Sequence, residues 1–207
     1  ADYNNNKVEI GGENAIVGSA YSIVTNNHIV NAKIVSTGSA ISVIDNSLVE
    51  NNDIDVKYLG MGISAAGSNV IVRNNTIFTA SGVGIHEKDD GSGLLVTKNN
   101  INSGSGIGIL IEKISSKRMP SNVTITFNDI ITSNKYAIDA SGVENGTGVI
   151  EENIVHGKNV KDPSGEYDGS RPSYKYNESR TYTVTPEHIR NYITPNGNLI
   201  GDVDDGV

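Results

Sequence analysis

The chain has 207 residues, a formal net charge of −8 and neither cysteine nor tryptophan. This length suits one extended domain with a buried core. The charge argues against nucleic-acid binding, because no basic stripe is present to neutralise phosphates. The lack of cysteine excludes a disulfide framework and a thiolate metal site. No apolar run approaches the roughly 18 residues of a membrane span, so membrane insertion is not expected.

The first pattern in chain order is a phrase with an apolar pair, asparagine and a closing isoleucine. Four full copies and two shorter ones occupy residues 23–29, 48–54, 71–77, 95–101, 125–130 and 150–154. The closing isoleucines lie 25, 23, 24, 29 and 24 residues apart. A repeat of this length predicts a solenoid. The β-branched residues divided by Asn and Gly favour short strands and tight turns.

A second phrase, a small residue followed by isoleucine, recurs between the first ones. Its copies are Ala40-Ile41, Gly62-Ile63, Gly84-Ile85, Gly108-Ile109 and Ala137-Ile138. Two strand phrases per repeat predict a coil of strands. Insertions collect at 87–93, 112–121 and 141–147, which predicts that one corner of each turn projects into solvent, where extra residues cost little.

The repeated asparagine predicts a stacked column. Strands of successive turns lie about 4.8 Å apart, and a side-chain amide both donates and accepts, so each amide can bond the next. The column is expected to contain Asn27, Asn52, Asn75, Asn99 and Asn128. Glu152 occupies this place in the last phrase and is expected to end the column. Residues 2–10 show no recognisable N-terminal cap.

Over roughly residues 8–157 these phrases resemble the right-handed parallel β-helix, or pectate-lyase-like, superfamily. Its members include polysaccharide lyases, mannuronan epimerases, polygalacturonases and phage tailspikes, and the segment 84–91 resembles a turn of epimerase and tailspike coils. The repeats and the resemblance predict an all-β chain with a coil of about six turns over 1–157. The repeat stops near Lys158 and prolines follow, which predicts an extended segment over 158–207 that packs on the coil or on a partner subunit. The resemblance predicts the fold and leaves the reaction open, because this fold hosts enzymes and inert spikes.

Strand parity predicts a column of large apolar side chains on the outer surface. It contains Ile23, Leu48, Ile71 and Leu95, and a second column contains Val30, Phe78, Ile131 and Val155. Aligned apolar stripes usually have a cover. Two covers are compatible with the sequence: the tyrosine-rich C-terminal segment, or further copies of the coil in a homotrimer.

Acidic residues of the inserted loops are the candidate catalytic groups. Carboxylates on adjacent turns lie about 5 Å apart, close to the separation in a retaining glycoside hydrolase. Glu87 or Asp89 with Glu112 is therefore the expected pair of acid and nucleophile. An ordinary solvated turn is the competing interpretation of 88–93.

A lyase or epimerase would need a base and a positive group that stabilises the enolate of a uronate. His86 could supply the base and Arg73 the clamp. Substrate contacts are expected from Arg73, Lys98, Asp139 and Asp90. No metal site or cofactor is predicted, although Glu87, Asp89 and Asp90 are oxygen ligands of the kind that Ca²⁺ uses.

The sequence therefore predicts an extracellular or virion-surface β-helix that binds a polysaccharide and, if it is an enzyme, degrades it. Two alternatives stay open. One is a non-enzymatic shaft or adhesin, whose outer stripes hold subunits together. The other is a polysaccharide lyase or C5-epimerase that acts on uronates.

Overall fold

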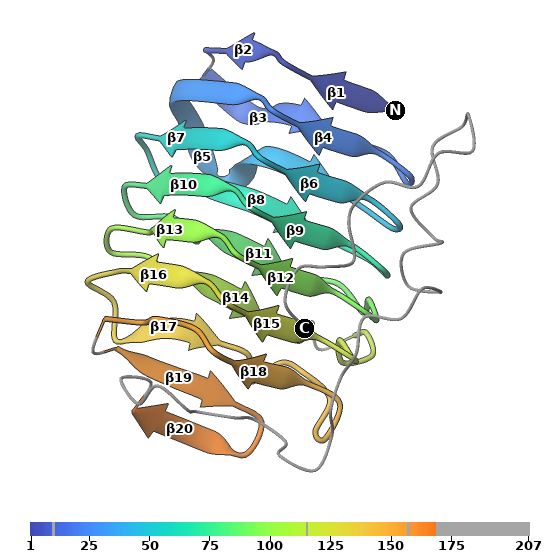
Figure 1. Ribbon diagram of the computed structural model, residues 1–207, viewed down its shortest axis with the longest axis vertical. Helices are drawn as coiled ribbons and strands as arrows, with labels where there is room; N and C mark the ends of the chain where they lie inside the picture. Colours follow the sequence, from blue (N-terminus) through green and yellow to red (C-terminus); the bar gives the residue numbers. More distant parts are fainter. Residues whose placement is uncertain (10, 115, 157, 169–207) are drawn as a thin grey trace.

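The computed structural model describes residues 1–9, 11–114, 116–156 and 158–168. It is a solenoid of short parallel strands stacked in three faces (Figure 1). The predicted all-β coil is confirmed. Within the described ranges, no helix is long and apolar enough to cross a membrane.

Face A carries the first strand of each asparagine phrase. Seven strands follow one another in parallel, with Ile23 opposite Leu48, Leu48 opposite Ile71 and Ile71 opposite Leu95. They are β1 (Asp2–Asn4), β4 (Ile23–Thr25), β6 (Leu48–Glu50), β9 (Ile71–Arg73), β12 (Leu95–Thr97), β15 (Thr124–Thr126) and β18 (Val149–Glu151).

Faces B and C complete each turn and form one 13-stranded sheet, because the long strand β5 (His28–Val43) belongs to both. Face B contains β2 (Lys7–Val8), the start of β5, β7 (Asp53–Val56), β10 (Thr76–Thr79), β13 (Asn100–Asn102) and β16 (Asp129–Ile131). Face C contains β3 (Gly11–Val17), the end of β5, β8 (Met61–Ala65), β11 (Ile85–Glu87), β14 (Ile109–Ile111), β17 (Tyr136–Asp139), β19 (Asn159–Asp162) and β20 (Gly165–Asp168).

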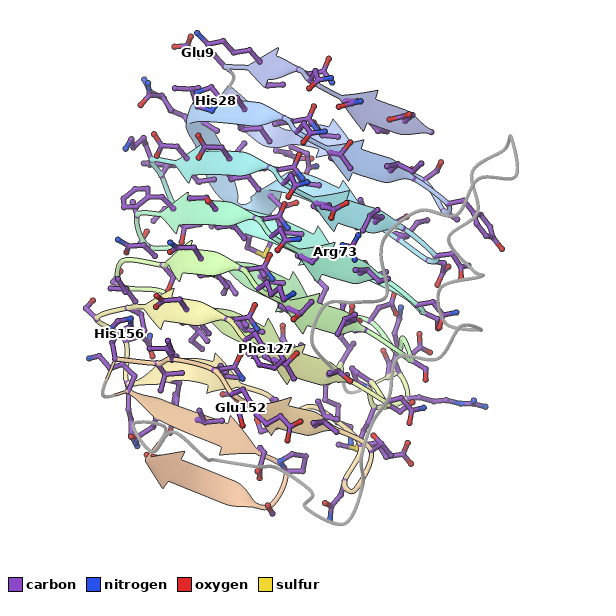
Figure 2. The ribbon with its side chains drawn as sticks, in the orientation of Figure 1. Glu9, His28, Arg73, Phe127, Glu152 and His156 are labelled. Carbon is purple, nitrogen blue, oxygen red and sulfur yellow. The ribbon has the colours of Figure 1, made fainter. Side chains whose placement is uncertain are left out.

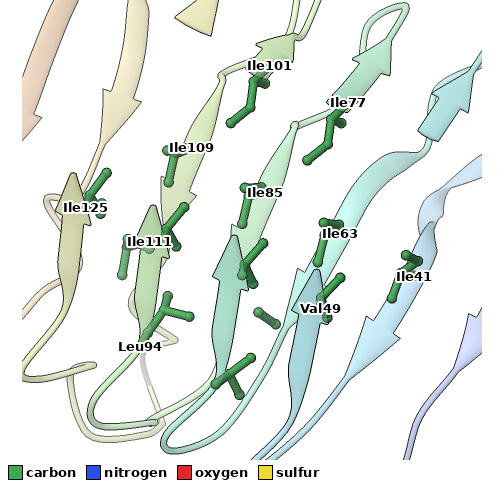
Figure 3. Packing of buried hydrophobic residues seen from close by; sticks show 14 of the residues in the cluster. Ile41, Val49, Ile63, Ile77, Ile85, Leu94, Ile101, Ile109, Ile111 and Ile125 are labelled. Carbon is green, nitrogen blue, oxygen red and sulfur yellow. The ribbon is translucent and has the colours of Figure 1, made fainter. Parts of the chain in front are cut away.

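The bore is filled by aliphatic side chains that repeat from turn to turn (Figure 3). Ile63, Ile85 and Ile109 stack in register on face C and are fully buried. The small residue before each of them is required by a close approach. A Cβ on Gly84 would lie 2.5 Å from both the Gly108 carbonyl oxygen and an Ile101 methyl group.

The corner between faces A and B explains why asparagine is doubled in the repeat. The first residue of each pair adopts a left-handed backbone, which Asn tolerates better than most residues. Seven such residues have φ between 53° and 56°: Asn5, Asn26, Asn51, Asn74, Lys98, Phe127 and Glu152. Figure 2 shows two of the exceptions, Phe127 and Glu152, at this corner.

The second asparagine forms the predicted ladder. Asn75 donates from Nδ2 to Oδ1 of Asn99 at 3.0 Å, and its own Oδ1 accepts from Nδ2 of Asn52 at 2.9 Å. The backbone N–H of each ladder residue also donates to the next Oδ1. Nδ2 further bonds carbonyl oxygens of its own strand and of the preceding turn. Each buried amide is therefore saturated by its neighbours.

The ladder does not end at Glu152, so that prediction is wrong. Ile154 lies opposite Asp129 and is exposed, whereas Val155 is buried in the core cluster. The last phrase is thus 149–155, with Glu152 at the left-handed position, and Asn153 continues the ladder by accepting from Asn128 Nδ2 at 2.9 Å. Val155 accordingly does not belong to the expected second outer column.

The N-terminal end also has a closure that the sequence analysis missed. Asn6 begins the ladder by donating to Asn27 Oδ1 at 2.9 Å. Tyr3 takes the place that Val24 occupies in the next turn and packs against the core. Its hydroxyl donates to the Val17 carbonyl at 3.0 Å, so the side chain reaches from face A to face C across the end of the bore.

Three of the four residues in the outer apolar column of face A are buried, and the fourth, Ile23, is half-buried. Leu48, Ile71 and Leu95 lie outside the core cluster, yet they are only 1%, 4% and 3% exposed.

The expected extended segment begins differently from the prediction, since β19 continues face C in parallel and β20 pairs with it antiparallel. The rest of that segment, including its tyrosines from Tyr174 onward, lies outside the described residues.

Candidate functional site

The loops that lead from face C back to face A surround a cavity of about 560 Å³. Each of four successive turns contributes to its wall, because the regular coil places their loops side by side. The lining residues are Ser68, Asp90, Ser92, Arg118, Met119, Ser121 and Glu144. Three of these four loops carry the insertions that were predicted to project into solvent, and the loop of Ser68 is the fourth.

Backbone hydrogen bonds join the loops into one wall. The Ser121 N–H donates to the Gly91 carbonyl at 3.0 Å, and the Gly93 N–H donates to the Ser121 carbonyl at 2.9 Å. The Glu144 N–H donates to the Pro120 carbonyl at 2.7 Å. The cavity is therefore built by the fold, although its residues belong to loops.

The chemistry of the wall is polar and of mixed charge. Asp90, Arg118 and Glu144 are exposed, and three serine side chains accompany them. Arg118 forms no ion pair with any residue in the described ranges, so its guanidinium retains its donors. Hydroxyl, carboxylate and guanidinium groups around one hollow can donate to and accept from a ligand rich in hydroxyl groups.

Beside this wall, His86 and Glu112 form a pair on the outside of face C. His86 Nε2 lies 2.9 Å from Glu112 Oε2, and Nδ1 lies 3.0 Å from Met61 Sδ. The His86 side chain is 10% exposed and that of Glu112 is 54% exposed. Burial lowers the pKa of His86 below its ordinary value, against the opposing effect of Glu112. A neutral imidazole held by a solvent-accessible carboxylate is an arrangement suited to proton transfer.

Glu87 does not face the solvent with its neighbours, which corrects the expectation that it lies with the outer groups. It alternates with His86 and pairs with the buried Ile111, and it is 1% exposed. Its Oε1 accepts the Asp89 N–H at 2.8 Å, while Oε2 has no hydrogen-bond partner in the described part of the chain. Burial, reinforced by the carboxylates of Asp89, Asp45 and Asp90, raises the pKa of Glu87 to about 8.

The proposed pairing of Glu87 with Glu112 as acid and nucleophile stays a prediction. The two residues lie on adjacent turns, and the Glu112 N–H donates to the Glu87 carbonyl at 2.8 Å. Their side chains, however, differ in accessibility, because one is enclosed and the other exposed. Glu112 is the carboxylate of this pair that solvent reaches.

Asp89 is engaged in a different contact. Its Oδ1 forms an ion pair with Lys117 Nζ, and it also accepts the Asp90 N–H at 2.9 Å. The hydrogen bond from Lys117 holds the pKa of Asp89 below its usual value. Asp89 thus ties the loop after β11 to the loop after β14.

The remaining predicted substrate contacts do not gather around the cavity, apart from Asp90. Asp139 lies on face C, where Oδ1 accepts from the Ser141 hydroxyl at 2.6 Å. Arg73 is buried on face A with Nε 2.9 Å from Glu50 Oε1. Lys98 occupies the left-handed corner between faces A and B.

The sequence did not single out Ser68, Arg118, Ser121 and Glu144 as site residues. The available signal was the lengthening of the loops at 112–121 and 141–147, which marked the correct corner without choosing side chains. Among the residues that the structure describes, no group of three or more His, Asp or Glu side chains is arranged to hold a metal ion.

Comparison with known proteins agrees with the architecture. A family model for the right-handed beta helix region matches residues 15–161. No curated protein and no solved structure gave a significant match.

Proposed function

Because the chain belongs to the right-handed β-helix family, we propose that it is an extracellular polysaccharide-binding protein whose ligand occupies the cavity between the loops. The observation that carries the proposal is the mixed lining of this cavity by residues of four turns. A sugar chain offers hydroxyl groups at regular intervals, and the loops offer donors and acceptors at the spacing of successive turns, about 4.8 Å.

Arg118 and Asp90 are the residues assigned to ligand contact. Both are exposed and line the cavity, so each can bond a hydroxyl group from a fixed place. The three serines extend the polar wall on which further hydroxyl groups would rest. Met119 supplies apolar surface, which suits the C–H groups of a sugar ring.

Binding is tested by affinity electrophoresis in gels that contain neutral or uronate polysaccharides. The wild-type chain is expected to be retarded by at least one polymer. Arg118→Gln combined with Asp90→Asn should remove the retardation, whereas Asn100→Ala, on exposed face B, should preserve it. Retardation that the double variant retains in full would contradict the assignment of the cavity.

Cleavage is the second candidate function, and the contact between His86 and Glu112 favours it. Glu112 would act as the base because solvent reaches its carboxylate, and His86 would orient that carboxylate by donating from Nε2. A hydrolase releases reducing ends without an unsaturated product, a lyase releases both, and an epimerase releases neither. His86→Gln and Glu112→Gln should abolish turnover without loss of polymer binding. No turnover of any bound polymer would leave a binding protein or a structural shaft.

A further inference from the structure

Glu87 is an ionisable side chain in the core, and its neighbours in the same column on the two adjacent turns are apolar. Ile111 lies opposite Glu87 in the following turn, and in the preceding turn the register of β8 and β11 places Ala65 at this position. All three residues are 1% exposed or less. A carboxyl group stands where its neighbours carry a methyl group or a butyl group, so the neutral acid fits this environment better than the anion.

The groups that face Glu87 do not offer compensation for a negative charge. The carboxylates of Asp45, Asp89 and Asp90 all oppose ionisation, and Lys117, the cation whose pKa responds to Glu87, is already paired with Asp89. The backbone N–H of Asp89 is the donor to Oε1, and Oε2 has no partner within the described ranges. An ionised Glu87 would therefore be under-solvated in its present position.

Glu87 is also connected to the wall of the cavity. It holds the Asp89 N–H, and Asp89 holds Lys117, which directly precedes the cavity residue Arg118. Asp90 follows Asp89 and lines the same cavity. A movement of residues 88–93 would thus displace an acidic and a basic group of the wall together.

We propose that Glu87 is a proton-operated latch for the loop cavity. With its proton, the side chain stays in the core and braces Asp89, which keeps the loops after β11 and β14 in the described arrangement. Without its proton, the carboxylate leaves the core for water and releases both loops. The latch regulates the site of the proposed function and rests on that function only for the identity of the ligand.

Because the sequence contains no cysteine, a single introduced cysteine can be labelled specifically. A single Ser116→Cys substitution in the loop after β14 carries a nitroxide spin label, whose mobility is measured from pH 6 to 9.5 without ligand. The mobility should rise several-fold with a midpoint near pH 8. A second label at Thr76→Cys on face B should show no such transition.

Two further variants separate the latch from a general loss of structure. In the Glu87→Gln background the loop should stay ordered at every pH, because the amide preserves the brace and cannot ionise. In the Glu87→Ala background it should be mobile at every pH, because the brace is lost. A transition that persists in Glu87→Gln, or a wild-type label that stays immobile up to pH 9.5, would overturn the proposal.

The ligand test is separate. If a polymer binds at pH 6, the latch predicts at least tenfold weaker binding at pH 9 for the wild type and unchanged binding for Glu87→Gln. Equal weakening of both proteins would overturn the coupling of latch and cavity. A polymer panel without any ligand would overturn the proposed function, while the spin-label result would still decide the latch.

Discussion

The two contrasting corners of the coil carry different kinds of information. At the corner between faces A and B, five successive turns repeat a left-handed residue followed by a buried asparagine. At the corner between faces C and A, each loop differs in length and composition, and four of them surround a cavity. A stacked ladder requires the same residue at the same place in successive turns, whereas a specific site requires different side chains from different loops. The repeat therefore stabilises the molecule, and the departures from it carry the function.

The largest effect on stability is expected in the middle of the ladder. Asn75→Ala removes five hydrogen bonds of a buried amide side chain and leaves several backbone and amide groups without partners. We expect a loss of about 3–5 kcal/mol in the free energy of unfolding. Urea denaturation measures it. The matched control Asn100→Ala, at an exposed position of the next turn, should lose less than about 0.5 kcal/mol, and equal losses would refute the structural role of the ladder.

Glu87→Gln should act in the opposite direction. The pKa of Glu87 is raised from 4.5 to about 8 by folding, so the folded state retains a proton that the unfolded state releases between these values. The stability of the wild type therefore falls as the pH rises through this range and is unaffected well below it. The variant should be more stable by about 3 kcal/mol at pH 7. Urea midpoints at pH 4 and pH 8 should show a gap that widens with pH, and a constant gap would contradict the assignment.

Phe127→Asn tests the preference for asparagine at the left-handed position of the corner between faces A and B. Phe127 has φ 55° and is 40% exposed, where most other turns carry asparagine. Restoring asparagine should relieve a left-handed backbone cost and remove little packing, so a gain of about 0.5–1 kcal/mol is expected. Thermal unfolding of the two proteins measures the gain. A clear loss of stability would show that the aromatic side chain packs better than its exposure suggests.

Arg118→Gln should have the smallest effect on folding. The side chain is exposed, and surface substitutions of this kind change the free energy of unfolding by less than about 0.5 kcal/mol. Its expected effect is on polysaccharide binding instead. A matched Lys88→Gln substitution, in the neighbouring loop and outside the cavity lining, should alter neither property.

The sequence predicted the fold well because the ladder and the close approaches impose residue types. Asn75 and Gly84 have few substitutes, since one must both donate and accept, and the other must leave room for a neighbouring carbonyl. The last phrase was misaligned because Ile154 and Val155 are both apolar, and only pairing with the previous turn decides which enters the core.

The site was less predictable because solvated loops impose no such requirement. Arg118 and Ser121 lie in an insertion with no repeating neighbour from which a side-chain position could be inferred. Glu87 was expected outside with the other charged residues, although its alternation with His86 places it inside. The charge of Glu87 suggested that its side chain lies in solvent, but the alternation of side chains along the strand places it in the core.

The most direct test of the functional assignment is an equilibrium titration with a polysaccharide identified by affinity electrophoresis, performed on Arg118→Gln with Asp90→Asn and on Asn75→Ala. We predict that the loop variant folds with the stability of the wild type and binds at least tenfold more weakly. We also predict that the fraction of the ladder variant that is folded binds normally. Normal binding by the loop variant, or weakened binding confined to the ladder variant, would contradict the division between a uniform structural corner and a variable functional one.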